Sequence, residues 1–217
     1  MEVMPLSLES LKRNGHNLHL GEFERAGPHQ IPVIQPVKTI ENLHWIPFNC
    51  SMTDTMRKHR GVHFFIDDYL FDRCWNDPAR YAKLLSEFRV VLSPDFSLFT
   101  DYPVAVQLYN HWRKHQLAAY WQSFGITVIP SICWSDEESF NWCFDGEPVG
   151  GVVAVSSVGT QKSQETRRLF LLGYNEMFDR LKPAKIIFFG DVPEGCCGNI
   201  EQHTSFYSGL AHAQRKR

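Results

Sequence analysis

The stretch Val62-His63-Phe64-Phe65-Ile66, followed at once by Asp67-Asp68, decides the fold that this chain is expected to adopt. Four more short, mainly apolar stretches also end in small or acidic residues before a helix-start signal: residues 90–92, 127–132, 152–155 and 186–189. Strands that are apolar on both faces and alternate with helices are typical of a parallel sheet covered on each side. The sequence therefore predicts that these strand ends gather at one rim.

Helix signals separate the strands. Asp77 before Pro78 is a cap with proline at the first helical position. Asp101 and Pro103 open a longer helix that Gly125 ends, and Ser163 caps the last large helix before Pro183. Ser135 with Glu138 has the spacing of a capping box, which predicts a short helix to about residue 144. Together with a first strand near residues 43–48, this order predicts about six strand-helix units.

The predicted fold class is α/β with a mainly parallel sheet. Two architectures fit, a doubly wound open sheet and a partial or irregular (β/α) barrel. We favour the barrel, because residues that could take part in catalysis or ligand binding follow nearly every strand rather than gathering at one crevice. A chain of 217 residues is most simply one domain. Residues 1–40, rich in Gly and Pro, are expected to form an irregular arm, 41–200 the α/β domain and 201–217 a basic tail.

Charge and hydropathy narrow the function classes. A net charge of −2 argues against a global electrostatic grip on nucleic acid. The local basic clusters at 57–60, 113–115, 167–168 and 215–217 are typical of solvated helix faces or a frayed terminus, with phosphate binding as the alternative. No apolar run approaches the roughly 20 residues of a membrane span, and the N-terminus is a poor secretory signal. The sequence predicts a cytoplasmic protein without a membrane partner.

The carboxylates that follow two of the strands are the candidate catalytic residues. Asp67 and Asp68 leave a strand of apolar and aromatic residues, and Asp95 leaves the next one. Partly desolvated carboxylates can divide general acid and base roles, or hold a divalent metal such as Mg. The structural alternative is that Asp67 or Asp68 caps the following turn and that Asp95 bonds its own backbone.

Candidate ligand contacts come from the remaining strand ends. Trp134 offers a stacking surface for a sugar or a nucleobase, although core packing also explains a tryptophan there. Ser156 is a possible polar contact. Asp136 and Asp191 are expected at the same rim, although acidic residues such as Asp136 also complement a helix N-terminus.

Two groups of potential metal ligands stand apart from the rim. His111 and His115 are one helical turn apart and could share a metal, but no third ligand is near them in sequence, so they are interpreted as surface residues. Cys196-Cys197 with His203 lacks the usual zinc spacing and is interpreted as a loop or partly buried thiol pair.

Several segments together resemble a family of bacterial, phage and mobile-element proteins that is known as a domain of unknown function. The likeness covers about residues 40 to 190. It is carried by the segments GVHFFIDDY (61–69), VLSPDFS (91–97), YNHWRK (109–114), AYWQ (119–122), PSICWSD (130–136) and WCFDG (142–146). The resemblance implies a prophage, plasmid or integrative-element setting and brings no established activity.

Three functional hypotheses follow. The first is a mobile-element protein with a hydrolase-like, carboxylate-lined site that acts on or binds a nucleotide or nucleic acid. The second uses two of the carboxylates as the acid and nucleophile of a glycoside hydrolase, which needs a pair about 5 to 10 Å apart. The third is a binding or regulatory module without catalysis that engages a host or mobile-element protein of replication, transfer or defence through the arm and the basic tail.

Overall fold

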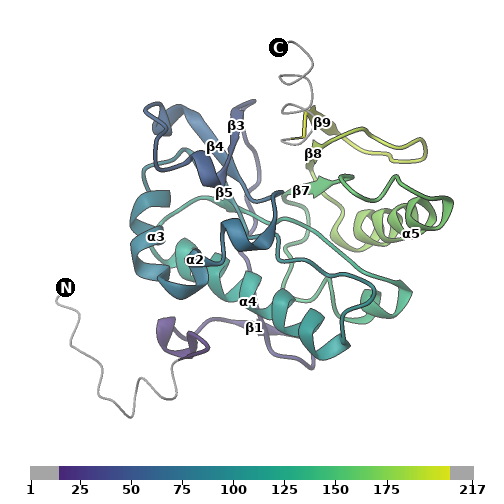
Figure 1. The fold of residues 1–217 in the computed structure, drawn as a ribbon, viewed down its shortest axis with the longest axis horizontal. Helices are drawn as coiled ribbons and strands as arrows, with labels where there is room; N and C mark the ends of the chain where they lie inside the picture. The colour runs from purple at the N-terminus through teal and green to yellow at the C-terminus, as the bar shows by residue number, and fades with distance from the viewer. Residues whose placement is uncertain (1–14, 206–217) are drawn as a thin grey trace.

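The computed structural model describes residues 15–205, and from residue 44 onward strands and helices alternate (Figure 1). The larger helices are α2 (Arg73–Asn76), α3 (Pro78–Leu85), α4 (Val104–Ser123) and α5 (Gln164–Leu181). Short 3-10 turns are η1 (Leu18–Leu20), η2 (Phe48–Cys50), η3 (Arg57–His59), η4 (Asp68–Leu70) and η5 (Glu137–Asn141). The strands of the domain are β3 (His44–Pro47), β4 (Arg60–His63), β5 (Val90–Leu92), β6 (Val128–Ile129), β7 (Val152–Ser156), β8 (Lys185–Phe189) and β9 (Ile200–His203).

The strands form two parallel sheets. One sheet has the order β3-β4-β5-β6 and the other the order β7-β8-β9, and every pairing within them is parallel. A single parallel bridge from Ser131 to Ala154 links the two sheets. The prediction of an α/β fold with mainly parallel sheets is therefore confirmed.

The strand order bears on the predicted barrel without settling it. Neighbouring strands follow the chain order, as in a barrel, and the ring of Trp45 on β3 lies 6.3 Å from that of His203 on β9. Within residues 15–205, however, no strand pairing joins β9 to β3. The partial barrel stays a prediction.

Side chains alternate between two hydrophobic clusters along β7 and β8. Val152, Ala154, Ile187 and Phe189 belong to the cluster that contains the residues of β4, β5 and β6. The alternate residues of the two strands belong to the second cluster, where they pack with Phe170, Tyr174 and Met177 of α5. These strand residues are Val153, Val155, Ile186 and Phe188. This period of two, with both faces buried, is what a sheet covered by helices requires. In Figure 1, α5 lies beside β7 and β8 while α2, α3 and α4 lie below the first sheet.

Helix caps explain where the longer helices begin. The side chain of Asp77 accepts a hydrogen bond from the backbone N–H of Arg80 at the start of α3, as predicted. Ser163 caps α5 in a reciprocal capping box with Thr166. The predicted cap at Ser135 is wrong, because the carboxylate of Asp136 accepts the N–H of Ser139 at the start of η5. The carboxylate of Asp136 accepts from one of the unpaired N–H groups in the first turn of the helix, so the hydroxyl of Ser135 does not have to cap it.

The N-terminal arm packs into the domain over its described part. β1 (Arg25–Ala26) and β2 (Ile31–Pro32) form an antiparallel pair, and Ile31 and Ile34 are fully buried. The N–H of Ile34 donates to the carbonyl of Gly146, and the N–H of Val152 donates to the carbonyl of Val37. Most of the other side chains in residues 15–40 are exposed or half-buried, and the partner-binding role of the arm stays a prediction. Residues 1–14 and the basic end of the tail lie outside the described residues.

Candidate functional site

A cavity of about 260 Å³ opens at the carboxyl ends of β4, β5, β6 and β7. Each of these strands contributes one of the predicted site residues: Asp67, Asp95 and Trp134 lie three to five residues beyond their strands, Ser156 is the last residue of β7, and all four line the cavity. Parallel strands bring their carboxyl ends to one edge, which is the reason that residues 89 positions apart in the sequence share a cavity. The rest of the lining is Phe65, Ile66, Ser97, Phe99, Ile132, Cys133, Val158, Thr160 and Phe170.

Asp95 is a titratable group in the cavity wall with a strongly raised pKa. Burial, and next the nearby charge of Asp68, raise the pKa of the Asp95 carboxyl from 3.8 to about 7. Lys114 and a hydrogen bond with Cys133 oppose that rise. One oxygen, Oδ1, is buried and has no hydrogen-bond partner in the described structure. The carboxyl is therefore close to half-protonated at neutral pH.

The turn that carries Asp95 is fixed by serines. The hydroxyl of Ser93 accepts the N–H of Ser131 at 2.8 Å, and the hydroxyl of Ser131 donates to the carbonyl of Ser93 at 2.8 Å. These two bonds tie the end of β5 to the end of β6. Asp95 therefore stands on a rigid support three residues beyond the strand.

Asp68 faces the same turn and not the cavity. Its carboxylate accepts the N–H of Ser97 at 3.1 Å and the hydroxyl of Ser97 at 2.8 Å. Burial raises the pKa of Asp68, while the hydrogen bonds from Ser97 lower it. Of the predicted catalytic trio, Asp67 and Asp95 line the cavity, and Asp68 positions the turn and acts on Asp95 through its charge.

Helix α5 holds Trp134 in place. The indole lies 5.4 Å from the ring of Phe170, centroid to centroid, at an angle of 41°. A Cβ built on Gly173 would lie 2.3 Å from the indole Nε1, so only glycine lets the ring lie this close to the helix. Trp134 is a fixed wall of the cavity.

Two predicted ligand contacts lie elsewhere. Asp136 caps η5 and does not line the cavity. Asp191 lines a neighbouring pocket of about 520 Å³ with Gly159, Gly190 and Gln202, and its backbone carbonyl accepts the hydroxyl of Ser157 at 2.7 Å. The local helix signal explains Asp136, while the position of Asp191 follows from the turn after β8.

Beneath the cavity lies a buried polar cluster that the sequence did not reveal. The Lys114 ammonium donates to the carbonyl of Ser131 at 3.1 Å and to Glu147 Oε1 at 2.5 Å, and both side chains are almost completely buried. Burial opposes the Lys114 charge, but Glu147 keeps its pKa raised. Lys114 in turn keeps the pKa of Glu147 lowered against the effect of burial. The 113–115 cluster was expected on a solvated helix face, and Lys114 and His115 are instead in the interior.

His111 and His115 are buried as well, so their interpretation as surface residues is wrong. His111 is 1% exposed and His115 is completely buried. A helix covered by the arm on one side and by the 142–147 segment on the other has no solvated face at these positions. No local sequence signal distinguishes such a helix from an ordinary surface one.

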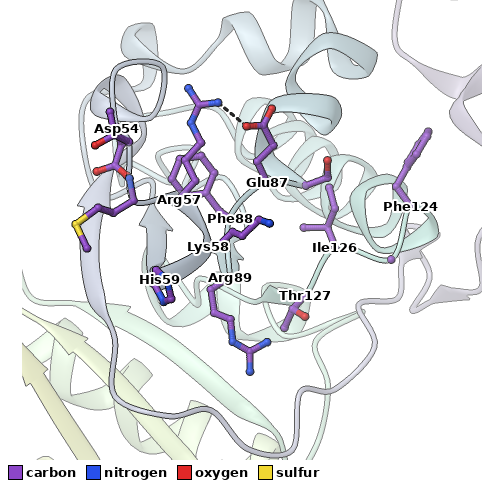
Figure 2. A pocket seen from close by; sticks show the side chains of 14 residues that line it. Asp54, Arg57, Lys58, His59, Glu87, Phe88, Arg89, Phe124, Ile126 and Thr127 are labelled. Atoms are coloured by element: carbon purple, nitrogen blue, oxygen red, sulfur yellow. Dashed lines mark hydrogen bonds and ion pairs between the residues drawn. The ribbon is translucent and has the colours of Figure 1, made fainter.

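A second pocket, of about 1020 Å³, lies at the amino ends of β4, β5 and β6, and Figure 2 shows its charged lining. Arg57, Lys58, Arg89, Asp54 and Glu87 all line it, and Arg57 pairs with Glu87 at 2.6 Å. Arg89 pairs with Glu41 at 3.0 Å outside the lining. Both arginines of this pocket are thus engaged in ion pairs.

The fold and the cavity define an α/β protein of parallel sheets with a carboxylate-bearing cavity at the strand ends. The chain belongs to the family described as "Domain of unknown function (DUF4417)", whose model matches residues 23–206. The resemblance seen in the sequence is thereby confirmed. No solved structure matches the chain. In the described residues, no helix is long and apolar enough to cross a membrane.

Two phage proteins are similar to the chain. It is 38% identical over 172 residues to "Gene 1 protein" of Mycobacterium phage L5, which covers 78% of this chain and 75% of the relative. It is 35% identical over 176 residues to "Gene 1 protein" of Mycobacterium phage D29, which covers 77% of this chain and 63% of the relative. The phage setting that the resemblance implied agrees with these relatives, whose printed names state no activity.

Proposed function

We propose that the cavity at the strand ends is a hydrolase-like site for a ligand of the nucleotide class, with Asp95 as its acid-base group. The observation that supports this most directly is a carboxyl with a pKa of about 7 in a cavity wall. A general acid or base works best when its pKa lies near the working pH, because both protonation states are then populated.

Asp67 supplies the second carboxylate. It comes from the end of β4, beside β5, and lines the same cavity as Asp95. In a hydrolytic reaction one carboxyl gives a proton to the leaving group, while the other takes a proton from the attacking water. Asp95, with its raised pKa, is suited to the acid role, and Asp67 is left the role of base.

The lining indicates which part of such a ligand enters. Among the residues that line the cavity there is no Lys, Arg or His, and there are two aspartates. A phosphate would meet two carboxylates without a cation, so we place the base and sugar inside and any phosphate outside. Trp134 gives the base a flat stacking surface, and the hydroxyl of Ser156, which accepts the N–H of Val158, can still donate to a polar group of the base.

A glycoside hydrolase is the second candidate, because the cavity lining that suits a nucleoside also suits a sugar. Two carboxylates and an indole without any nearby cation also suit an uncharged sugar ring. The choice between the two rests on the leaving group, which is a nucleobase in one case and an alcohol in the other.

Incubation of the full chain with nucleosides, nucleotides and oligosaccharides, with and without Mg, tests both proposals. We expect nucleoside binding to quench tryptophan fluorescence, and product analysis to show release of the base. Asp95→Asn should lower turnover by about 100-fold or more, while Asp191→Asn, outside the cavity, should leave it unchanged. Hydrolysis of oligosaccharides alone would select the second candidate. Absence of binding by every ligand, or full activity of Asp95→Asn, would refute the site.

A further inference from the structure

The structure supplies the third ligand that the sequence lacked for His111 and His115. Glu147, 32 residues beyond His115, joins them in the interior, and one ligand atom from each of the three residues lies within 4.8 Å of the others. We propose that His111, His115 and Glu147 form a buried site for a divalent transition-metal ion of the zinc class. This site is separate from the cavity lining and does not depend on its proposed function.

The hydrogen bonds of the histidines fix which nitrogens are available. His111 Nε2 lies 3.1 Å from the carbonyl of Asp145, and His115 Nδ1 lies 2.8 Å from the carbonyl of Pro32. A carbonyl only accepts, so each of these nitrogens carries the proton. Protein metal sites show the same arrangement, in which one ring nitrogen is anchored and the other faces the ion.

The remaining atoms are acceptors without enough donors. His111 Nδ1 and Glu147 Oε2 are buried and have no hydrogen-bond partner. His115 Nε2 lies 3.1 Å from Glu147 Oε1, which leaves two lone pairs facing one another when the histidine is neutral. Buried acceptors that lack donors are costly. A cation bound by these atoms would satisfy all of them at once.

The hydrogen bonds leave the ligand atoms in the form that a metal requires. Each histidine uses one ring N–H for a backbone carbonyl, so its other ring nitrogen has a lone pair to offer. Neutral imidazole and ionised carboxylate are the forms that bind metal. Lys114 occupies Glu147 Oε1 and leaves Oε2 for the ion.

Charged groups of both signs surround the cluster. Lys114 faces Glu147 and Asp95. Asp145 has a buried, unpartnered Oδ2 and faces His115, His29 and Arg180. Asp145 therefore offers a further carboxylate beside the three ligands.

Geometry and ligand type point to zinc rather than to magnesium. Two imidazoles and one carboxylate are a common zinc set, whereas magnesium prefers oxygen ligands. With bonds of about 2.0–2.1 Å, a tetrahedral ion holds its ligands about 3.3 Å apart, so these side chains need to approach by no more than about 1.5 Å. The ion would join α4 to the turn at 145–147.

Metal analysis of the full chain tests the proposal. Because the ligands are buried, the chain should be expressed with added Zn²⁺, or refolded with Co²⁺, before unbound metal is removed. We expect one ion per chain, which His111→Gln and His115→Gln abolish. His63→Gln is the matched control, because His63 is also buried, with an unpartnered Nδ1, but belongs to no such group. It should keep the full metal content.

The coordination shell of the unaltered protein provides a test that does not depend on the folding of variants. X-ray absorption of the zinc-loaded chain should show imidazole and oxygen ligands. Sulfur in the shell would assign the ion to the cysteines and overturn the proposal. The absence of bound zinc, or full metal content in both histidine variants, would overturn it as well.

Discussion

The two ends of the parallel strands carry hollows of different character. At the amino ends the pocket is about four times larger, about 1020 Å³ against about 260 Å³, but both of its arginines are in ion pairs with glutamates. At the carboxyl ends the cavity is smaller, and Asp95 keeps a buried oxygen without a hydrogen-bond partner. Size therefore does not identify the site. The raised pKa of the Asp95 carboxyl in the smaller cavity is the better guide, since strongly perturbed titratable groups in a cleft are typical of functional sites.

The largest expected difference between the two ends is in the strength of an ion pair. Glu147→Gln leaves the buried Lys114 ammonium without its charge partner, and this should lower the free energy of unfolding by about 3–5 kcal/mol. Glu87→Gln, which breaks the partly exposed pair with Arg57, should cost no more than about 1 kcal/mol. Urea unfolding in the presence of EDTA measures both. Equal losses would contradict the contrast.

A smaller effect is expected in the pH dependence that Asp95 gives to stability. Its pKa is 3.8 when unfolded and about 7 when folded, so the folded state binds the proton more tightly. Stability then falls as the pH rises from about 4 to about 7. The full difference is about 4 kcal/mol, and we expect about half of it because the residue is partly exposed.

Urea unfolding between pH 4.5 and 7.5 tests this slope in three proteins. Between pH 4.5 and 7.5, the free energy of unfolding of Asp95→Asn should fall by about 2 kcal/mol less than that of the unaltered chain, because the variant has no carboxyl to titrate at this position. Asp101→Asn, at an exposed position, should behave like the unaltered chain. Identical profiles for Asp95→Asn and the unaltered chain would show that the carboxyl does not titrate in this window.

The smallest effect concerns the wall of the cavity. Gly173→Ala places a methyl group against the indole of Trp134, which should cost about 1–2 kcal/mol through overpacking and should weaken ligand binding. Asn175→Ala, at an exposed position of the same helix, should change stability by no more than about 0.5 kcal/mol. Thermal melting and tryptophan fluorescence report the two effects. An unchanged indole spectrum in Gly173→Ala would contradict the close approach.

The rim could be predicted because it depends on two local signals. Strands without a polar face indicate a parallel sheet, and the residue after each strand is then placed without knowledge of side-chain packing. Asp67, Asp95, Trp134 and Ser156 meet in one cavity on this basis. Asp136 departs from it because a local hydrogen bond from Ser139, three residues on, decides where its carboxylate points, while the carboxylate of Asp68 is held by Ser97, which lies 29 residues away in sequence and meets it only in the folded chain.

Strand β9, in contrast, could not be predicted from its own sequence. Its sequence, Ile-Glu-Gln-His, has a single apolar residue and gives no strand signal, yet it pairs with β8 along all four residues. An edge strand with little buried surface obtains its structure from the backbone pairing that its neighbour offers. The sheet thus extends past residue 200, beyond the last strand that the sequence predicts.

The sequence by itself determined the alternation of strands and helices, the parallel direction and the edge at which the aspartates gather. The spacing of apolar residues and the helix-cap signals depend on residues that are neighbours in sequence, so they can be recognised without knowledge of any long-range contact. Only the tertiary structure decided that His111, Lys114 and His115 are interior residues and that Glu147 meets them, because burial of a helix face depends on which distant segments cover it. The same dependence sets the pKa of Asp95, since desolvation and the charge of Asp68 act through space rather than along the chain.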